Sequence, residues 1–117
     1  MSRLRLADEE GRMIATLEVA ESLLAAARGL SFRTTLAADE GMWFPGVRSI
    51  HMLGMRLPID VLFLSHEQDG LRIVRHIARD VRPWTGLAAD HGADGCIELA
   101  AGAAAGIAVG DRVTLRP

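Results

Sequence analysis

The sequence has a single cysteine, Cys96, and no lysine. One cysteine excludes a disulfide within the chain and any metal site built from a cysteine cluster, and it fits a reducing compartment. The 13 basic residues are outnumbered by 15 acidic ones, so the net charge is −2. The basic excess typical of nucleic-acid-binding proteins is missing. We therefore expect neither a cysteine-based metal site nor a nucleic-acid partner.

Long apolar runs are missing as well. No uninterrupted apolar stretch approaches the roughly 20 residues that a membrane span needs. The N-terminus runs into Asp8-Glu9-Glu10 without the apolar segment of a signal peptide. We expect a cytoplasmic protein with no membrane partner.

The chain does contain enough apolar residues for one core. Half of its 117 residues are hydrophobic and 24% are charged, which suits a folded chain of single-domain size. No internal repeat, low-complexity segment or linker divides it. We expect one domain over residues 1–117.

Short stretches of alternating or β-branched apolar residues, separated by turn residues, dominate the pattern. Residues 3–6 and 12–19 flank a turn at 8–11 and are typical of a hairpin. Residues 80–94 look like the longest irregular connection, and residues 100–107 like a loop or a helical turn. Further strands are expected at 41–44, 48–52, 60–65, 71–77, 96–99 and 112–115, and one short helix is expected at 22–28, ended by Gly29. This pattern predicts a mainly β fold with one short helix, in a compact antiparallel, jelly-roll-like sandwich or barrel.

Five short motifs occur in an order that supports a family resemblance. They are Ala27 to Arg33, Gly41 to Phe44, Pro58 to Val61, Ile97 to Gly102 and Gly106 to Asp111. In this order and spacing the chain resembles the family known as domain of unknown function 192, over about Val19 to Leu115. The resemblance implies a compact, mainly β, jelly-roll-like fold, and it brings no established activity with it.

The chain departs from many members of that family just before Pro58. Where those members have Trp-Met-Lys-Asn-Thr, this sequence has His51 to Met55, which removes an amine, an amide and a hydroxyl. It is similar to the branch with a His-x-x-Gly-Met-Arg-x-Pro-Ile-Asp signature and a later Arg-Pro-Trp, here Arg82-Pro83-Trp84.

The polar residues of the stretch 48–60, together with Arg82 and Trp84, are the candidate ligand-binding residues. Guanidinium groups bind carboxylate or phosphate in a bidentate fork, and an indole ring can add a stacking wall. An equal alternative is that Pro83 and Trp84 plug one end of the barrel while the arginines pair with acids. The complete candidate set is Arg48, His51, Arg56, Asp60, Arg82 and Trp84.

Three residues offer acid-base or metal-ligand chemistry, namely His51, Asp60 and Glu98. Each also has a structural interpretation. His51 can be hydrogen-bonded inside the barrel, and Asp60 can form an ion pair with Arg56 or Arg48.

Glu98 is expected beside Cys96, on the opposite side of its strand from Ile97 and Leu99. The favoured interpretation makes it a surface residue or the partner of an arginine.

Three function hypotheses remain open. The leading one is a non-catalytic binding or accessory module for a small anionic ligand or a peptide, with its site near His51, Arg56 and Asp60. The second is a small hydrolase or metal-dependent enzyme that uses His51, Asp60 and Glu98. The third is a structural protein that pairs an exposed strand in a homodimer. No phosphate loop, dinucleotide fingerprint or nucleophile elbow occurs, so we expect no cofactor. Because Cys96 is alone and the four histidines are scattered, we expect no bound zinc or copper. We expect a monomer or a homodimer.

Overall fold

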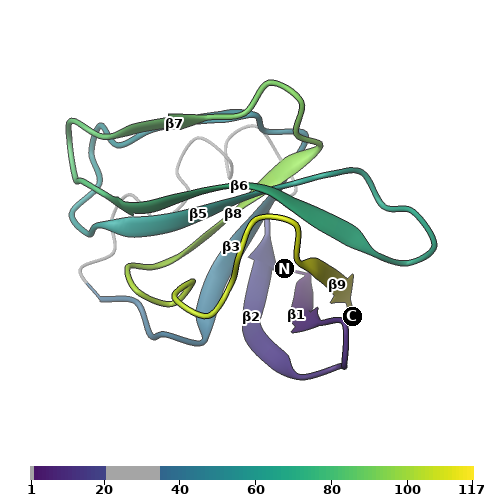
Figure 1. Ribbon diagram of the computed structural model, residues 1–117. Helices are drawn as coiled ribbons and strands as arrows, with labels where there is room; N and C mark the ends of the chain where they lie inside the picture. Colours follow the sequence, from purple (N-terminus) through teal and green to yellow (C-terminus); the bar gives the residue numbers. More distant parts are fainter. Residues whose placement is uncertain (1, 21–34) are drawn as a thin grey trace.

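The computed structural model describes residues 2–20 and 35–117, and these residues form strands and turns without a helix. The strands are β1 (Arg3–Asp8), β2 (Met13–Val19), β3 (Glu40–Pro45), β4 (Ser49–His51), β5 (Ile59–Leu64), β6 (Arg72–Val81), β7 (Leu87–Ala89), β8 (Gly95–Ala100) and β9 (Arg112–Arg116), as Figure 1 shows. The mainly β prediction is thus confirmed. The short helix predicted at 22–28 and the glycine that ends it, Gly29, lie outside the described residues.

Seven of the strands pair in the order β1-β2-β3-β8-β5-β6-β9, and β9 pairs back with β1, so the pairing closes into a ring. The pairs are antiparallel except β2 with β3, which run parallel. The prediction of a wholly antiparallel fold is therefore wrong at this pair. Residues 20–39 connect the two strands, a length that allows the crossover that parallel neighbours require. The finer description as a jelly roll stays a prediction.

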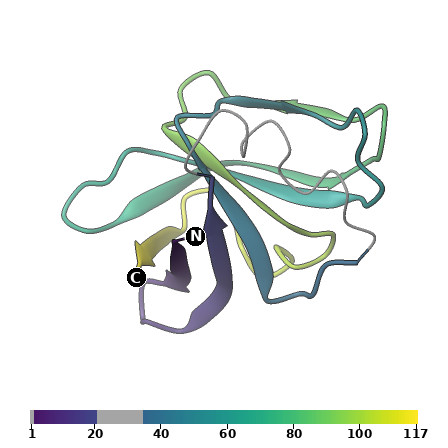
Figure 2. The ribbon, with the colours of Figure 1, turned by 180° about the vertical axis from the view of Figure 1, so that it is seen from behind.

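The remaining strands, β4 and β7, form a separate two-stranded antiparallel sheet. We call residues 46–58 and 82–93, which contain these strands and their flanking loops, the β4–β7 unit. The unit runs over β5 and β6 as a second layer in both ribbon views (Figure 1, Figure 2). The sequence predicted β4 but assigned the region of β7 to an irregular connection, because Leu-Ala-Ala is short and has weak β propensity.

Apolar side chains form two clusters, one on each face of the sheet β3-β8-β5. The inner cluster lies within the ring and takes residues from all seven strands, among them Leu17, Trp43, Leu62, Ile97 and Leu99. The outer cluster joins that sheet to the β4–β7 unit and includes Met42, Val61, Phe63, Cys96, Met52 and Met55. Because side chains alternate along a strand, β8 sends Ile97 and Leu99 inward and Cys96 outward, as the sequence predicted.

Candidate functional site

Two segments that the sequence singled out separately meet in the β4–β7 unit. The backbone N–H of Trp84 donates to the carbonyl of Met52 at 2.9 Å, and the N–H of Met52 donates to the carbonyl of Gly86 at 3.1 Å. His51 of β4 lies opposite Leu87 of β7 in the strand register. The His51 segment and the Arg82-Pro83-Trp84 segment are therefore neighbours.

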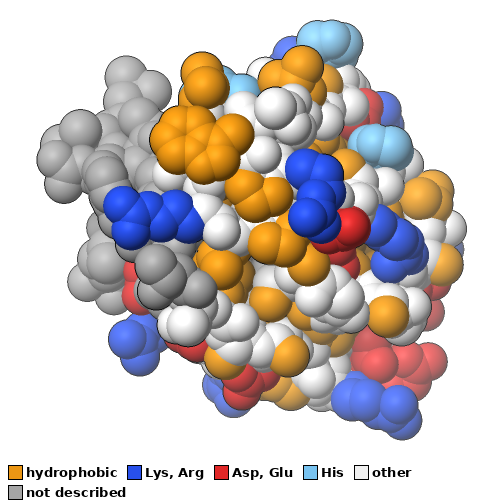
Figure 3. Space-filling view, turned by 90° about the vertical axis from the view of Figure 1, so that its left-hand side faces the viewer, with side chains coloured by type: hydrophobic (Ala, Val, Ile, Leu, Met, Phe, Trp, Pro, Cys, Tyr) orange, Lys and Arg blue, Asp and Glu red, His pale blue; other side chains and the backbone are white. Residues whose placement is uncertain are grey.

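This end of the unit exposes large apolar side chains to solvent. Leu53, Trp84 and Leu87 are 65%, 58% and 77% exposed. Figure 3 shows a face on which hydrophobic side chains are exposed close to Arg and His side chains. We call the set Leu53, Trp84, Leu87, His51, Arg56 and Arg82 the end patch. Sequence reasoning missed Leu53 and Leu87, since an isolated leucine in an apolar pattern predicts burial.

The backbone at Trp84 is in the left-handed region, with φ of 67°. A bulky side chain rarely adopts this conformation, and such residues cost about 1–3 kcal/mol each. The turn is fixed by the N–H of Gly86, which donates to the carbonyl of Arg82 at 3.0 Å. A Cβ at Gly86 would lie 2.6 Å from that same carbonyl oxygen, so glycine is required for the close approach. The chain thus holds an exposed indole in a strained turn, an arrangement that stability alone does not favour.

The end patch carries positive charge without compensating acids in its own segments. Its two arginines, Arg56 and Arg82, belong to the stretches 46–58 and 82–89, which contain no aspartate or glutamate. Arg56 is exposed and takes part in none of the ion pairs between described residues. Arg82 pairs with Asp80 at 3.0 Å, but both side chains are largely exposed and such pairs contribute little.

Arg48 and Asp60, two other predicted binding residues, lie away from the end patch. Arg48 precedes β4 at its opposite end, where its carbonyl accepts the N–H of Asp90. Asp60 is 2% exposed on β5 and pairs in register with Leu99, so it faces the inner cluster.

The carboxylate of Asp60 is held by backbone groups and not by an arginine. Its Oδ1 accepts the N–H of Asp80 at 2.9 Å, and its Oδ2 accepts those of Gly102 and Ala104, both at 3.0 Å. The predicted ion pair with Arg56 or Arg48 is therefore wrong. Asp60 ties β5 to the end of β6 and to the turns after β8, and the structure explains it fully as a scaffold residue.

Glu98 is buried, at 7% exposure, on the outer face of β8. No described group satisfies its Oε1 with a hydrogen bond. Burial raises the pKa of Glu98 to about 7, and burial together with Glu98 raises the pKa of neighbouring Cys96 to about 12. The expectation of a surface glutamate is wrong, because the β4–β7 unit adds a second layer that strand alternation along β8 does not reveal. No ion pair between described residues includes Glu98.

The three catalytic candidates do not converge. Glu98 pairs in register with Val61 and faces the outer cluster, whereas Asp60, one residue earlier on β5, faces the inner one. His51 is exposed on β4. Within the described ranges, no group of three or more His, Cys, Asp or Glu side chains is placed to hold a metal ion. The sheet therefore separates Asp60 from Glu98, so the two carboxyl groups do not form a pair.

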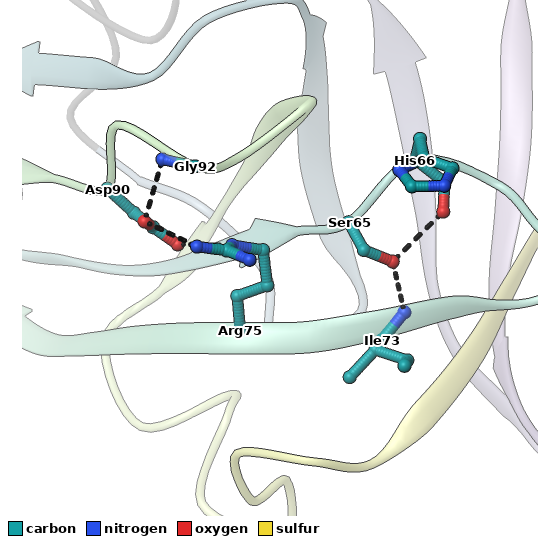
Figure 4. Close-up of polar contacts among 6 residues, drawn as sticks. All are labelled: Ser65, His66, Ile73, Arg75, Asp90 and Gly92. Carbon is teal, nitrogen blue, oxygen red and sulfur yellow. Dashed lines mark hydrogen bonds and ion pairs between the residues drawn. The ribbon is translucent and has the colours of Figure 1, made fainter.

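Arginines of β6 attach loops to the ring. Figure 4 shows the contact of Arg75 with Asp90 of the β4–β7 unit, at 2.9 Å, and the N–H of Gly92 donating to the same carboxylate. The hydrogen bond from Arg75 lowers the pKa of Asp90, and that from Gly92 adds to it. Arg79 donates to the carbonyls of Ala104 and Ile107 at 2.6 Å each. Arg75 and Arg79 thus hold loops against the ring, so the arginines of β6 do not form a continuous, unpaired basic surface.

A groove of about 490 Å³ lies elsewhere, between the β1–β2 turn and the loops that flank β9. Its lining mixes acidic residues with Arg12 and Arg112, and it includes none of the residues predicted for a site. Glu9 and Arg112 pair at 3.3 Å across it.

Comparison with known families matches one family over residues 5–115, the DUF192 family, described as an uncharacterised ACR. The chain belongs to the DUF192 family. The match extends over almost the whole chain, so the resemblance read from the five motifs is confirmed at the level of the family. The branch signature that runs from His51 to Asp60 is not tested by it.

Two solved structures are similar to this DUF192 protein. One, a candidate transcription regulator from Sinorhizobium meliloti 1021, is 30% identical with a TM-score of 0.79, over 97% of this chain and 92% of that one. The other, a protein of unknown function from Novosphingobium aromaticivorans DSM 12444, is 28% identical with a TM-score of 0.75, over 95% and 82% of the two chains. No curated protein matches the chain. In the described part of the chain, no helix has the length and apolarity to cross a membrane.

Proposed function

We propose that this protein is a non-catalytic binding module whose end patch binds an acidic peptide segment of a partner protein. The observation that carries the proposal is Trp84, an exposed indole in a left-handed turn, flanked by exposed Leu53 and Leu87. Tryptophan and arginine are the residues most enriched at the energetic centres of protein interfaces.

The charge of the patch selects the partner's chemistry. His51 pairs in register with Leu87, Arg82 lies two residues before Trp84, and Arg56 lies three residues after Leu53. The stretches 46–58 and 82–89 contain no acid. Arginine side chains favour carboxylate groups through paired N–H donors. A peptide that alternates acidic and apolar side chains would therefore match both parts of the patch.

A peptide suits the patch better than a small anionic molecule does. A small-molecule site is usually a concave pocket that buries most of its ligand. The three apolar side chains of the end patch are instead largely exposed, and the groove between the β1–β2 turn and β9 includes none of them. Arg48 and Asp60, expected in the binding site from the sequence, are left out of this proposal.

The description of the Sinorhizobium meliloti protein as a candidate transcription regulator belongs to that protein. A regulator can act by binding DNA or by binding another protein. The net charge of −2 favours protein binding over DNA binding for this chain, and so do the hydrogen bonds that occupy Arg75 and Arg79 of β6.

The test is a titration with short synthetic peptides that alternate Glu with Leu, compared with peptides in which Lys replaces Glu. We expect the acidic peptide to shift the NMR signals of the Trp84 indole and of residues 51–56, and the basic peptide to leave them unchanged. Charge reversal in Arg56→Glu should weaken binding roughly tenfold, as loss of one charge-assisted contact does, and Arg12→Glu, on the far turn, is the matched control.

Equal binding of both peptides, or shifts confined to other surfaces, would contradict the proposal. Concentration-dependent sedimentation with shifts at the same residues would show that a second copy of the chain occupies the patch. That result would favour the homodimer hypothesis instead.

A further inference from the structure

Beneath the β4–β7 unit, the sheet presents one ionisable acid among apolar side chains. Glu98 lies between Met42 of β3 and Val61 of β5 in the strand register. Directly paired residues of antiparallel strands point to the same face, so these three side chains are neighbours on the outer face. Met42, Val61 and the adjacent Cys96 all belong to the outer cluster.

The carboxyl group of Glu98 lacks the partner that its burial calls for. Its Oε1 is inaccessible to solvent and accepts no hydrogen bond from any described group. Buried polar atoms in native proteins are almost always satisfied, and an exception requires an explanation. The chain has no lysine, and Arg75 and Arg79 of nearby β6 are engaged with Asp90 and with backbone carbonyls. The described residues therefore supply no donor for Oε1.

The layer that covers this face contributes adaptable side chains. Its contribution to the outer cluster includes Met52 and Met55, whose flexible side chains adapt to irregular neighbours. Hydrogen bonds inside the unit join its two segments, from Met52 to Gly86 and from Trp84 to Met52. Left-handed glycines at Gly46 and Gly54, with φ of 77° and 83°, mark turns on either side of β4. A ligand on this face would therefore displace the methionine side chains, while the Arg75–Asp90 ion pair keeps the unit attached to β6.

We propose that Glu98 anchors a second binding site, between β8 and the β4–β7 unit, for a small ligand that joins an apolar body to a protonated primary amine. The ammonium group donates a hydrogen bond to Oε1 of Glu98. The apolar body packs against Met42, Val61 and the methionines of the unit, in place of contacts that they now make with one another.

An ammonium group suits this acid better than a neutral donor. A charge-assisted hydrogen bond is roughly twice as strong as a neutral one, and the apolar surroundings exclude competing water. Because burial raises the pKa of Glu98 to about 7, a nearby cation would draw the carboxyl into its ionised form at neutral pH. Cys96, beside Glu98 on β8, stays neutral because its pKa is raised to about 12. On the same face, His76 of β6 stacks on Phe63 of the outer cluster, with ring centroids 5.7 Å apart. Arg75 and Asp90, which join β6 to the unit, are paired with each other.

The test uses benzylamine and butylamine as probes on the whole protein at pH 8, with methyl-labelled methionine observed by NMR. Benzyl alcohol and benzoate are the neutral and anionic counterparts of benzylamine. We expect the amines to shift the methyl signals of Met42 and Met52 and to leave that of exposed Met13 on β2 unchanged. In Glu98→Gln, which keeps the size of the side chain, the Kd for benzylamine should rise roughly tenfold or more.

Two further measurements exclude a merely structural role. Arg56→Ala in the end patch should leave the benzylamine Kd unchanged, which separates this site from the proposed peptide surface. Affinity should also fall about tenfold between pH 8 and pH 6, as a carboxyl that titrates near pH 7 loses its charge.

Absence of methionine shifts with every amine would overturn the proposal and assign the unsatisfied oxygen to a buried water. The same conclusion would follow if benzyl alcohol bound as tightly as benzylamine. An unchanged Kd in Glu98→Gln would place the amine at another site and would also overturn it.

Discussion

At the scale of single residues, two buried carboxyl groups on adjacent strands have opposite roles. Asp60 accepts three backbone N–H groups, whereas Glu98 accepts no hydrogen bond at Oε1 from the described residues. A carboxylate that satisfies buried donors stabilises a fold, and one that is desolvated without partners destabilises it. Substitution at the two positions should therefore change stability in opposite directions.

Asp60→Ala should lower the free energy of unfolding by at least about 2–3 kcal/mol, because it leaves the N–H groups of Asp80, Gly102 and Ala104 without their acceptor. Urea denaturation measures this loss directly. His51→Ala is the matched control, since His51 is exposed on β4 and a surface change of this kind stays within about 0.5 kcal/mol. Equal midpoints for the two variants would show that the loops after β6 and β8 do not depend on Asp60.

Glu98 should make stability fall as pH rises. Its pKa is about 7 in the folded protein against an ordinary value of 4.5, so the folded state binds more protons than the unfolded state between these values. The contribution of Glu98 to the free energy of unfolding is therefore highest below pH 4.5 and declines from there to about pH 7. The total loss is about 3 kcal/mol. The lowered pKa of Asp90 acts in the opposite direction, but only at more acidic pH.

The measurement is the urea midpoint of the wild-type protein and of Glu98→Gln at several pH values from 5 to 8. The decline should be present in the wild type and largely absent in the variant. The same pH dependence in the wild type and in Glu98→Gln would mean that Glu98 ionises normally in the folded protein.

At the scale of elements, the close contacts of β8 with β3 depend on a glycine. A Cβ at Gly95 would lie 2.3 Å from the ring of Trp43 and 2.8 Å from the carbonyl oxygen of Phe44. Trp43 is itself held at 5% exposure, with the guanidinium of Arg72 at 5.0 Å from its ring centroid. The indole therefore has little room to move aside.

Gly95→Ala should destabilise the protein by about 1–3 kcal/mol, the usual cost of overpacking a core. Gly106→Ala is the control, because a Cβ at that position meets no atom within 4 Å and its backbone is not left-handed. Thermal or urea denaturation of both variants checks the difference. Equal stability would mean that β3 and β8 can separate at this point without loss.

Two substitutions at Trp84 test the strain of its backbone and the function of its side chain separately. Trp84→Gly relieves the left-handed conformation, so it should be more stable than Trp84→Ala by up to about 1 kcal/mol, because alanine keeps the strain. Both variants should lose binding of the acidic peptide, since both remove the indole. A glycine variant that is no more stable than the alanine variant would mean that the turn is not strained, and retained peptide binding in either would remove Trp84 from the proposed site.

At the scale of the whole molecule, the sequence predicts what repeats along one strand and misses what depends on contact between distant segments. Alternation on β8 predicted correctly that Glu98 lies opposite Ile97 and Leu99. Its burial requires the β4–β7 unit, whose two halves are separated by β5 and β6 in the sequence. The donors that Asp60 accepts lie 20, 42 and 44 residues away along the chain. No local pattern specifies such pairs.

The candidate site, like the fold, could be predicted only in part from the sequence. The family resemblance directed attention to His51 and to Arg82-Pro83-Trp84, and the structure places these segments side by side. The exposure of Leu53 and Leu87 was not predicted, because it depends on the orientation of a three-residue strand and of a tight turn. Arg48 was grouped with His51 because of their closeness in sequence, although they stand at opposite ends of β4.

The closed pairing of the ring also has a consequence for aggregation. Each of its seven strands has a neighbour on both sides over at least part of its length, which restricts the free edge to which a foreign strand could add. Among the described residues, β4 and β7 pair on one side only and are three residues long, and β6 pairs with β9 only at Arg72 and Ile73. Detachment of β9 would therefore uncover β1 and extend the unpaired side of β6 in a single event.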